Sequence, residues 1–113
     1  MNSDCLFCRI IAGEIPADVV SETEHTIAFR DINPQAEVHI LVVPRLHEPD
    51  IASLAAADAD VTIALLAETR RVAEAESGGQ YRLVFNTGEA AGQMVFHVHG
   101  HVLGGQIHDR LPS

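Results

Sequence analysis

The stretch His97-Val98-His99-Gly100-His101-Val102-Leu103 carries three imidazoles at alternate positions. Because neighbouring side chains on a β-strand point to opposite faces, all three would share one face and span about 14 Å. Val98 and Val102 would point the other way, into a core. A cluster of ordinary hydrogen-bonded histidines is the plain alternative, but burying three imidazoles without a task leaves many polar groups to satisfy. The stretch therefore predicts chemistry or metal binding on one face of a strand.

The other segments predict a single α+β domain over residues 1–113. The order lacks the regular βαβ alternation of doubly wound folds, which favours a mainly antiparallel five-stranded sheet. Its edge strands would invite dimerisation. The long helix is predicted from an apolar stripe of Val61, Leu65 and Val72. We expect a short helix over 5–12, strands over 19–22, 26–30, 38–43, 80–85 and 95–103, and the long helix over 58–77.

Charge and composition limit the possible partners. The 113 residues carry 16 acidic side chains against seven arginines and no lysine, for a formal net charge of -9. This balance argues against a general nucleic-acid or anionic-membrane surface. No apolar run approaches the roughly 20 residues that cross a bilayer, and the first residues do not resemble a secretory signal, so we expect a cytoplasmic protein. Any phosphate would be held locally, by imidazoles and the backbone N–H groups of loop 86–93.

Two kinds of chemistry fit the three imidazoles. With an ordinary pKa near 6.5, imidazole offers a neutral nucleophilic nitrogen at pH 7, which suits attack on phosphorus without a separate base. A second possibility is a catalytic metal coordinated by His97, His99 and His101, as in three-histidine zinc sites. Metal analysis of a His99→Ala variant would separate the two.

Several segments in the same order resemble the histidine triad (HIT) family, whose signature alternates histidine with apolar residues. The resemblance runs through 6–16, 28–36, 39–44, 92–93 and 97–105. It is most similar to the small nucleotide-binding branch related to the Hint proteins. The resemblance implies a HIT-like fold with a five-stranded sheet, one short N-terminal helix and one long helix, and a homodimer.

The resemblance also implies an activity. It predicts a hydrolase or transferase that cleaves purine nucleoside 5′-phosphate derivatives, such as phosphoramidates, acyl-nucleotides or dinucleotides of AMP or GMP. His99 would attack the α-phosphorus to form a nucleotidyl-histidine that water resolves. His101 would contact the phosphate, with His39 and His97 completing the catalytic group. The implied nucleotide contacts are Leu6, Phe7, Phe29, Asp31, Ile32, Asn86, Gly92, Gln93, Met94, His99 and His101.

Three positions, one of them outside this list, leave alternatives open. Asp31 precedes Asn33-Pro34 and could be a turn residue instead of a ribose ligand. Gly100 stands where relatives carry a bulky apolar residue, although it would face away from the imidazoles. Met94 stands where relatives often carry a serine or threonine that can interact with the leaving group. A nucleotide-binding regulatory module with negligible turnover is therefore the alternative to an enzyme.

Cys5 and Cys8 form a C-x-x-C pair, which is half of a tetrahedral zinc site. The pair alone is weak evidence for zinc, since a redox pair or two free thiols could have the same C-x-x-C spacing. A thioredoxin-like motif would follow a strand, and we expect none before Cys5. Some HIT relatives and the galactose-1-phosphate uridylyltransferases pair such cysteines with two histidines. That resemblance implies a closed, structural zinc site of Cys5, Cys8, His47 and His97.

Overall fold

The computed structural model describes residues 4–107, so the ends of the expected domain, residues 1–3 and 108–113, lie outside the described part. Its strands form one antiparallel sheet in the order β1-β2-β3-β5-β4. The expected α+β fold with a five-stranded antiparallel sheet is confirmed. The elements are α1 (Leu6–Ile11), β1 (Val19–Glu22), β2 (Thr26–Arg30), β3 (Ala36–Pro44), α2 (Ile51–Ala57), α3 (Ala59–Ser77), β4 (Arg82–Val84), a short 3-10 helix (Glu89–Ala91) and β5 (Gly100–Ile107).

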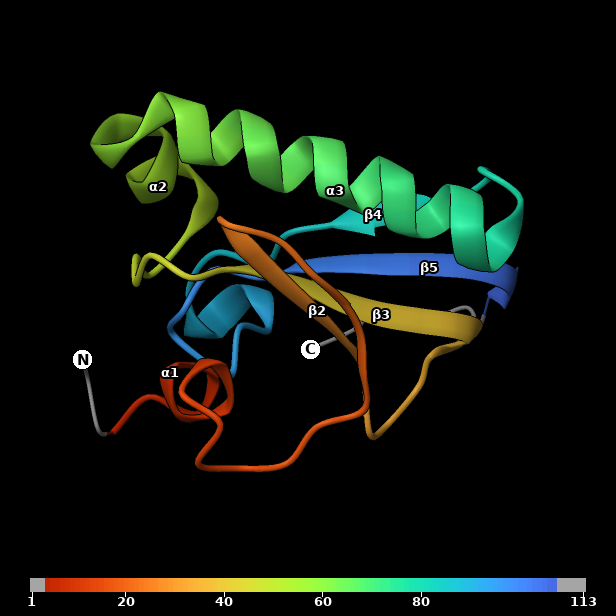
Figure 1. The fold of residues 1–113 in the computed structure, drawn as a ribbon, viewed down its shortest axis with the longest axis horizontal. Helices are drawn as coiled ribbons and strands as arrows, with labels where there is room; N and C mark the ends of the chain where they lie inside the picture. Colours follow the sequence, from red (N-terminus) through yellow and green to blue (C-terminus); the bar gives the residue numbers. More distant parts are fainter. Residues whose placement is uncertain (1–3, 108–113) are drawn as a thin grey trace.

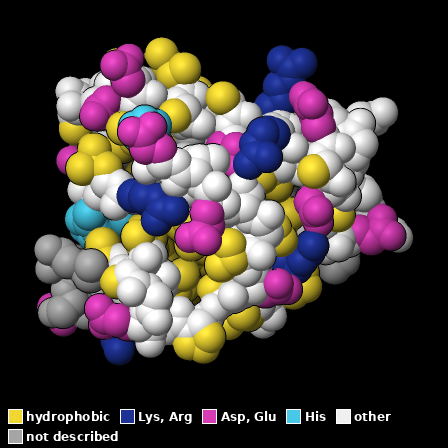
Figure 2. Space-filling model, viewed as in Figure 1, with side chains coloured by type: hydrophobic (Ala, Val, Ile, Leu, Met, Phe, Trp, Pro, Cys, Tyr) yellow, Lys and Arg dark blue, Asp and Glu magenta, His cyan; other side chains and the backbone are white. Residues whose placement is uncertain are grey.

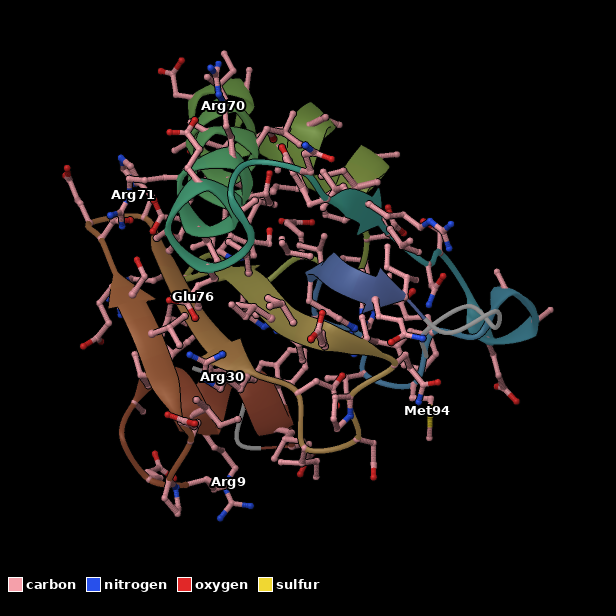
Figure 3. The ribbon with its side chains drawn as sticks, turned by 90° about the vertical axis from the view of Figure 1, so that its right-hand side faces the viewer. Arg9, Arg30, Arg70, Arg71, Glu76 and Met94 are labelled. Atoms are coloured by element: carbon pink, nitrogen blue, oxygen red, sulfur yellow. The ribbon has the colours of Figure 1, made fainter. Side chains whose placement is uncertain are left out.

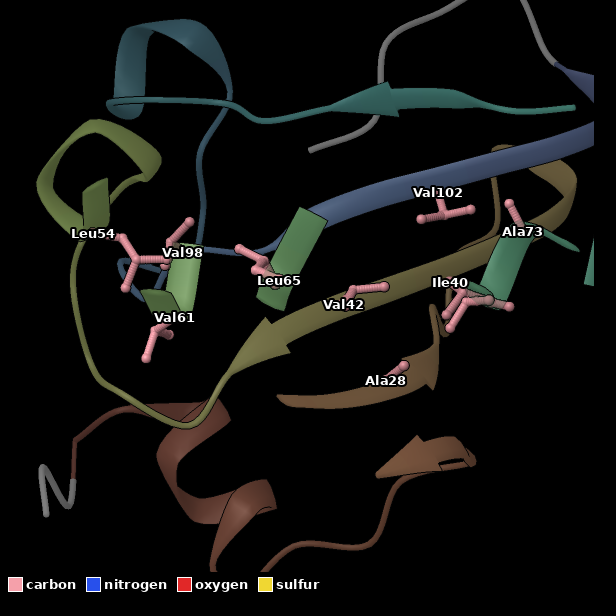
Figure 4. Packing of buried hydrophobic residues seen from close by; sticks show 10 residues of the cluster. Ala28, Ile40, Val42, Leu54, Val61, Leu65, Ala73, Val98 and Val102 are labelled. Atoms are coloured by element: carbon pink, nitrogen blue, oxygen red, sulfur yellow. The ribbon is translucent and has the colours of Figure 1, made fainter. Parts of the chain in front are cut away.

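The sheet separates two different layers. Figure 1 shows α3 lying along one face and α1 on the opposite side. Ile40 and Val42 of β3 pack into the core beneath α3, as Figure 4 shows. Leu41 and Val43 alternate with them and pack toward α1. His39 is on the same face as Leu41, so β3 supplies both the core and the face that carries the histidines.

The long helix follows the sequence expectation closely. Its N-cap is Asp58, whose side chain accepts the backbone N–H of Val61 at 3.0 Å. It ends at Gly78, which adopts a left-handed φ of 67° that glycine tolerates. The predicted stripe of Val61, Leu65 and Val72 is buried. Burial of each such side chain contributes roughly 1.5 to 3 kcal/mol, so this stripe anchors the helix on the sheet.

The seven-residue helix α2 was not predicted. Asp50 caps it by accepting the Ser53 N–H at 2.8 Å, and Leu54, on the inner side of the helix, is fully buried. Asp50 and the alanines at 55–57 carried the signal for this helix. The helix is short and ends at the residue that caps α3, so its pattern merges with that of the longer helix.

The last strand starts later than predicted. We expected 95–103, whereas β5 covers Gly100–Ile107. Before it, the N–H of Val98 donates to the Glu48 carbonyl at 2.8 Å, outside the ladder of the sheet. The first two histidines of the run therefore lie ahead of the strand instead of along it, and need not share one face.

The described surface mixes charges of both signs. Figure 2 shows arginines scattered among acidic side chains on one face. Arg30 donates to Glu76 at 2.6 Å and lies 3.5 Å from Asp18, and Figure 3 shows Arg30 and Glu76 side by side. Arg71 likewise donates to Glu68. These arginines are matched with carboxylates and do not gather into a basic patch. Within residues 4–107, no helix has the length and apolar character needed to cross a membrane.

Candidate functional site

Four cysteine and histidine side chains from three segments meet at the start of α1. Cys5 is the N-cap of α1, and its Sγ accepts the backbone N–H of Cys8 at 3.2 Å. Nδ1 of His97 lies 3.3 Å from Cys5 Sγ, 3.5 Å from Cys8 Sγ and 3.1 Å from His47 Nδ1. His47 Nδ1 lies 3.3 Å from Cys8 Sγ. These four residues, here called the Cys–His cluster, are close enough to hold one metal ion.

The donor set of this cluster fits a tetrahedral ion. Nε2 of His97 donates to the Pro44 carbonyl at 2.8 Å, so the neutral ring directs its Nδ1 lone pair toward the sulfurs. Burial is the main cause that lowers the pKa of His97 to about 4; the bond to Pro44 opposes it, and His47 and His99 reinforce it. The ring is therefore neutral at pH 7, as ligation requires. Ligand atoms around a tetrahedral zinc ion lie about 3.3 to 3.8 Å apart, close to the separations here.

The ring of His99 is oriented by the backbone of His97. Its Nδ1 lies 2.8 Å from the His97 carbonyl oxygen, which can only accept a hydrogen bond. The proton is therefore on Nδ1, and the neutral ring has its lone pair on Nε2. Phe7 packs edge-on against this ring, with centroids 4.9 Å apart. An imidazole held in one tautomer with its lone pair on Nε2 can act as a nucleophile.

His39 and His101 form a directed pair. The N–H of Gln35 donates to His39 Nδ1 at 3.0 Å, which places the proton of a neutral His39 on Nε2. That nitrogen lies 3.0 Å from His101 Nδ1 and 3.4 Å from Asp31 Oδ2. His101 then accepts on Nδ1 and carries its own proton on Nε2. The pair can therefore direct an N–H of His101 at an anion.

The same geometry argues against a metal at this second group. Asp31, His39 and His101 are close enough to share an ion. However, the Gln35 N–H keeps the proton of His39 on Nε2, the atom that would have to coordinate. Burial lowers the pKa of His39, with Asp31 opposing and His99 reinforcing the shift, so the ring is neutral at pH 7. A hydrogen-bonded relay fits these residues better than a metal site.

Three histidines meet in a cavity of about 250 Å³, here called the histidine pocket. Asp31 enters it from the end of β2, and its Oδ1 accepts the Asn33 N–H at 2.8 Å. Asp31 is thus a turn residue and a pocket residue together, so the two alternatives for it do not exclude each other. The pocket is lined by Phe7, Asp31, Ile32, Asn33, Gln35, His39, Leu41, Met94, Val95, His99 and His101.

A second cavity of about 450 Å³, here called the apolar pocket, adjoins the first. The two share Phe7, Asp31, Ile32 and Leu41. Ile32 is 92% exposed beside this cavity, where a bound planar group would cover its side chain. The apolar pocket is lined by Leu6, Phe7, Ile10, Ile15, Pro16, Ala17, Asp18, Phe29, Arg30, Asp31, Ile32 and Leu41.

Two neighbouring residues in the loop before β5, Gln93 and Met94, occupy different environments. Gln93 is buried, and its amide is hydrogen-bonded to backbone: Oε1 accepts from Gly88, and Nε2 donates to the carbonyls of Pro49 and Val95. It braces the loop and is not among the described residues that line the histidine pocket. Met94, the next residue, is 74% exposed at the rim of that pocket, and Figure 3 shows it projecting outward.

Two other predicted contacts lie together in the same loop. Gly92 has a left-handed φ of 97°, and a Cβ built there would lie 3.8 Å from Asn86 Nδ2. Neither residue is among the described residues lining the histidine pocket. Their contact with a nucleotide stays a prediction.

The hypothesis of one metal shared by His97, His99 and His101 is wrong. The ring of His97 lies among the cysteines, and Nδ1 of His99 is engaged by a carbonyl. The prediction that the three histidines share one face assumed a strand from residue 95, whereas His97 lies ahead of β5 and points elsewhere. Val98 and Val102 do pack into the core, as expected. Gly100 faces the same side, where an added Cβ would lie 3.0 Å from Phe85, so the departure at Gly100 concerns packing.

Comparison with known proteins agrees with this geometry. The model of the HIT domain matches residues 12–108. The chain belongs to the HIT family. It is 37% identical over 108 residues to the purine nucleoside phosphoramidase of Escherichia coli K12, covering 94% of this chain and 91% of that one. A HIT family hydrolase from Clostridium thermocellum superposes with a TM-score of 0.88 at 39% identity, covering 100% of this chain and 98% of that one. The histidine triad nucleotide-binding protein of Candida albicans superposes with a TM-score of 0.80 at 29% identity, covering 96% of this chain and 83% of that one.

Sequence reasoning about this HIT chain missed parts of the site. Ile10 and Leu41 line the apolar pocket, and the Gln35 N–H fixes the tautomer of His39. The apolar spacing of Leu6 and Ile10 along α1 carried a signal for the first. A backbone N–H carries no residue-specific signal, so the role of Gln35 could be found only from the structure.

Proposed function

We propose that this HIT protein hydrolyses purine nucleoside 5′-phosphoramidates and related α-phosphorus derivatives through a covalent nucleotidyl-His99 intermediate. The observation that carries the proposal is the bond from His99 Nδ1 to the His97 carbonyl, which places the proton on Nδ1 and the lone pair on Nε2, the nitrogen that would attack phosphorus. The phosphoramidase relative from Escherichia coli supports the same class of substrate.

The proposed reaction has two displacements at phosphorus. His99 Nε2 forms a bond to the α-phosphorus while the P–N bond of the substrate breaks with its electron pair on nitrogen. The amine leaves after accepting a proton from water in the open pocket. A second water then attacks phosphorus, the bond to Nε2 breaks with its electron pair returning to the ring, and the water releases a proton to solvent. His101 donates an N–H to the phosphate oxygens throughout, supported by His39.

The base and ribose would lie toward the apolar pocket. Leu6, Phe7, Phe29 and Ile32 line it and could enclose a purine ring, while Asp31 accepts hydrogen bonds from ribose hydroxyls. The exposure of Ile32 supports this assignment because a stacked base would remove its side chain from water. Asn86, Gly92, Gln93 and Met94 would form the phosphate end of the site through the loop that carries them.

We also propose that the Cys–His cluster holds a structural zinc ion. Two thiolates and two neutral imidazoles supply a closed set with no open position. The ion would fasten α1 to the segment before β5 and keep the His97 carbonyl in place for His99. Cys5 and Cys8 are not joined in a disulfide, which fits a reducing cytoplasm, where we expect the protein. Metal content per chain, compared with a Cys5→Ser variant, tests this assignment.

The protein is further proposed to be a homodimer of single-domain chains. β1 and β4 are the edge strands of the sheet and could pair with a second copy. Sedimentation at micromolar concentration tests this proposal, and a monomer would reject it.

The deciding experiment measures AMP release from adenosine 5′-phosphoramidate by wild type and His99→Ala at equal metal content. We expect release by the wild type and a trapped adduct one nucleotidyl group heavier than the chain after acid quench. His99→Ala should give neither. Binding of AMP without any release would instead favour a nucleotide-binding regulatory module.

A further inference from the structure

The two sulfurs of the Cys–His cluster are close enough to react with each other. The candidate ligand atoms of the cluster, both Sγ atoms among them, all lie within 4.8 Å of one another. The backbone N–H of Cys8 donates to Cys5 Sγ at 3.2 Å, so the two residues share one helical turn. Residues three apart on such a turn have Cα atoms about 5 Å apart, which lies within the range that a disulfide spans. A bond between the sulfurs therefore needs rotation of the side chains more than movement of the backbone.

One of the two sulfurs borders a cavity that is open to water. Cys5 lines a cavity of about 570 Å³, in whose wall Leu6 is 43% and Phe96 49% exposed. Cys8 is buried and is not among the described residues that line this cavity. Asp4 is the one carboxylate among those lining residues, and no arginine is among them, so a neutral molecule enters more easily than an anion. A small neutral oxidant therefore reaches Cys5 before Cys8.

The cysteines are joined to the reacting histidine through His97. Nδ1 of His97 lies 3.3 Å from Cys5 Sγ and 3.5 Å from Cys8 Sγ. The carbonyl of His97 accepts the Nδ1 proton of His99 at 2.8 Å. Phe7 lies between the cysteines in the chain and packs edge-on against both imidazoles, with centroids 6.1 Å and 4.9 Å away. A bond between the sulfurs changes both sulfur contacts of the His97 ring and, with them, the segment that orients His99.

We propose that Cys5 and Cys8 are an oxidation site, at which a hydroperoxide converts the reduced pair into a disulfide and so lowers the hydrolase activity. The disulfide stands independently of the proposed function, whereas the effect on activity rests on it. A disulfide leaves no thiolate for the proposed zinc ion, so oxidation also releases that ion. A thiol reductant restores the pair.

The oxidation has two displacements at sulfur. The Cys5 thiolate attacks one oxygen of hydrogen peroxide, so that an S–O bond forms, the O–O bond breaks and hydroxide leaves. The Cys8 thiolate then attacks Cys5 Sγ, the S–S bond forms, the S–O bond breaks and a second hydroxide leaves. Each hydroxide takes up a proton from solvent. Two thiolates are thereby oxidised to one disulfide while one peroxide is reduced to two waters.

The test treats the purified wild-type protein with increasing hydrogen peroxide and then alkylates the thiols that remain. Mass spectrometry should show a chain that has lost two hydrogen atoms and carries no alkyl group, and dithiothreitol should reverse both changes. Zinc released to a chromophoric chelator should rise in step with the disulfide. AMP release from adenosine 5′-phosphoramidate should fall by about 10- to 100-fold, the cost of misplacing a reacting group by about 1 Å, and recover with dithiothreitol and added zinc.

A matched variant separates cysteine oxidation from oxidation of the exposed methionine at the histidine pocket. Met94 is 74% exposed and is the other sulfur in the described chain that peroxide can oxidise. Met94→Leu should lose the same fraction of its own untreated activity as the wild type, with the same recovery. A loss of activity that Met94→Leu abolishes, or that dithiothreitol does not reverse, overturns the proposal.

The remaining outcomes distinguish the oxidation site from the proposed function. Thiols that stay reduced at peroxide concentrations that oxidise Met94, or disulfides that form only between chains, overturn the oxidation site. A disulfide within the chain that leaves AMP release unchanged overturns its effect on activity. Absence of AMP release from the untreated protein overturns the proposed function instead. Chain mass and zinc release then still decide the oxidation site, because neither measurement depends on a substrate.

Discussion

The Cys–His cluster and the histidine pocket are built from neighbouring residues but use imidazole in opposite ways. In the cluster, the Nε2 proton of His97 is held by Pro44, so the Nδ1 lone pair points inward to other ligands. Two residues later, the Nδ1 proton of His99 is held by a carbonyl, so the lone pair is on Nε2. The ring nitrogen that meets the backbone decides the chemistry of the other nitrogen. Identical side chains on one segment can therefore serve as a ligand and as a nucleophile.

The sharpest way to separate the two regions is to remove the nucleophile. His99→Ala should lower kcat by roughly 10⁴-fold or more, because His99 is the residue proposed to form the covalent intermediate. Its metal content should equal that of the wild type. Rapid-quench measurement of AMP release together with elemental analysis checks both statements. His25→Ala, which removes an exposed histidine in the β1–β2 turn, is the matched control, and equal losses in both variants would contradict the prediction.

The converse change breaks the cluster. Cys8→Ser should lose the metal and lower the free energy of unfolding by roughly 3 kcal/mol or more, because ligation energy is also folding energy. Urea unfolding with and without a chelator measures the effect. The chelator should lower the free energy of unfolding of the wild type and leave that of Cys8→Ser unchanged. A variant that retains one metal ion per chain would exclude Cys8 as a ligand.

A smaller effect is expected from interrupting the relay. His39→Gln should lower kcat by about 100-fold, since a positioned hydrogen-bond donor to the reacting phosphate contributes about that much and His39 orients the one on His101. Because His39 touches His101 and not the Cys–His cluster, metal content should not change. Steady-state kinetics on adenosine 5′-phosphoramidate provide the measurement. A rate within twofold of the wild type would remove His39 from the catalytic group.

The smallest predicted effect concerns Glu68, which lies outside both regions and makes the stability of the fold depend on pH. Burial alone would raise the pKa of Glu68, but hydrogen bonds from Arg71 and Ser21 outweigh it and leave the pKa below its usual value. The unfolded chain then takes up the proton first, so this stabilisation is present above about pH 4.3 and disappears as the pH falls further. Glu68→Gln should reduce stability at pH 7 by roughly 0.5 to 1 kcal/mol.

The measurement is urea unfolding of wild type and Glu68→Gln at pH 7 and pH 3.5. The difference between the two proteins should shrink at the lower pH. A difference that grows on acidification would reverse the assigned sign.

The sequence predicted the sheet and the long helix because their patterns are long and regular. It also predicted the four residues that form the Cys–His cluster, through a family resemblance whose ligand set meets in space. It failed where a contact distant in sequence overrides a local pattern. The Val98 N–H pairs with Glu48, so alternation over the histidine run begins at Gly100 and not earlier.

Gln93 illustrates a second limit of sequence reasoning. A loop amide before a histidine run suggests a ligand contact, and that contact stays a prediction; nothing in the sequence indicates that the amide is also bonded to backbone at Gly88, Pro49 and Val95. Only the fold, which brings Pro49 beside this loop, reveals the partner. Backbone groups that select a tautomer, such as the Gln35 N–H, are likewise invisible in a sequence.

The division of β3 between two faces has a genetic consequence. Ile40 and Val42 serve the core while His39 and Leu41 serve the histidine pocket, so removing one codon within this strand would exchange the two sets. Single-codon insertions and deletions there should be eliminated under selection for function, whereas many conservative substitutions at the core positions Ile40 and Val42 survive. Strand length, more than residue identity, would then be the most tightly inherited property of this segment.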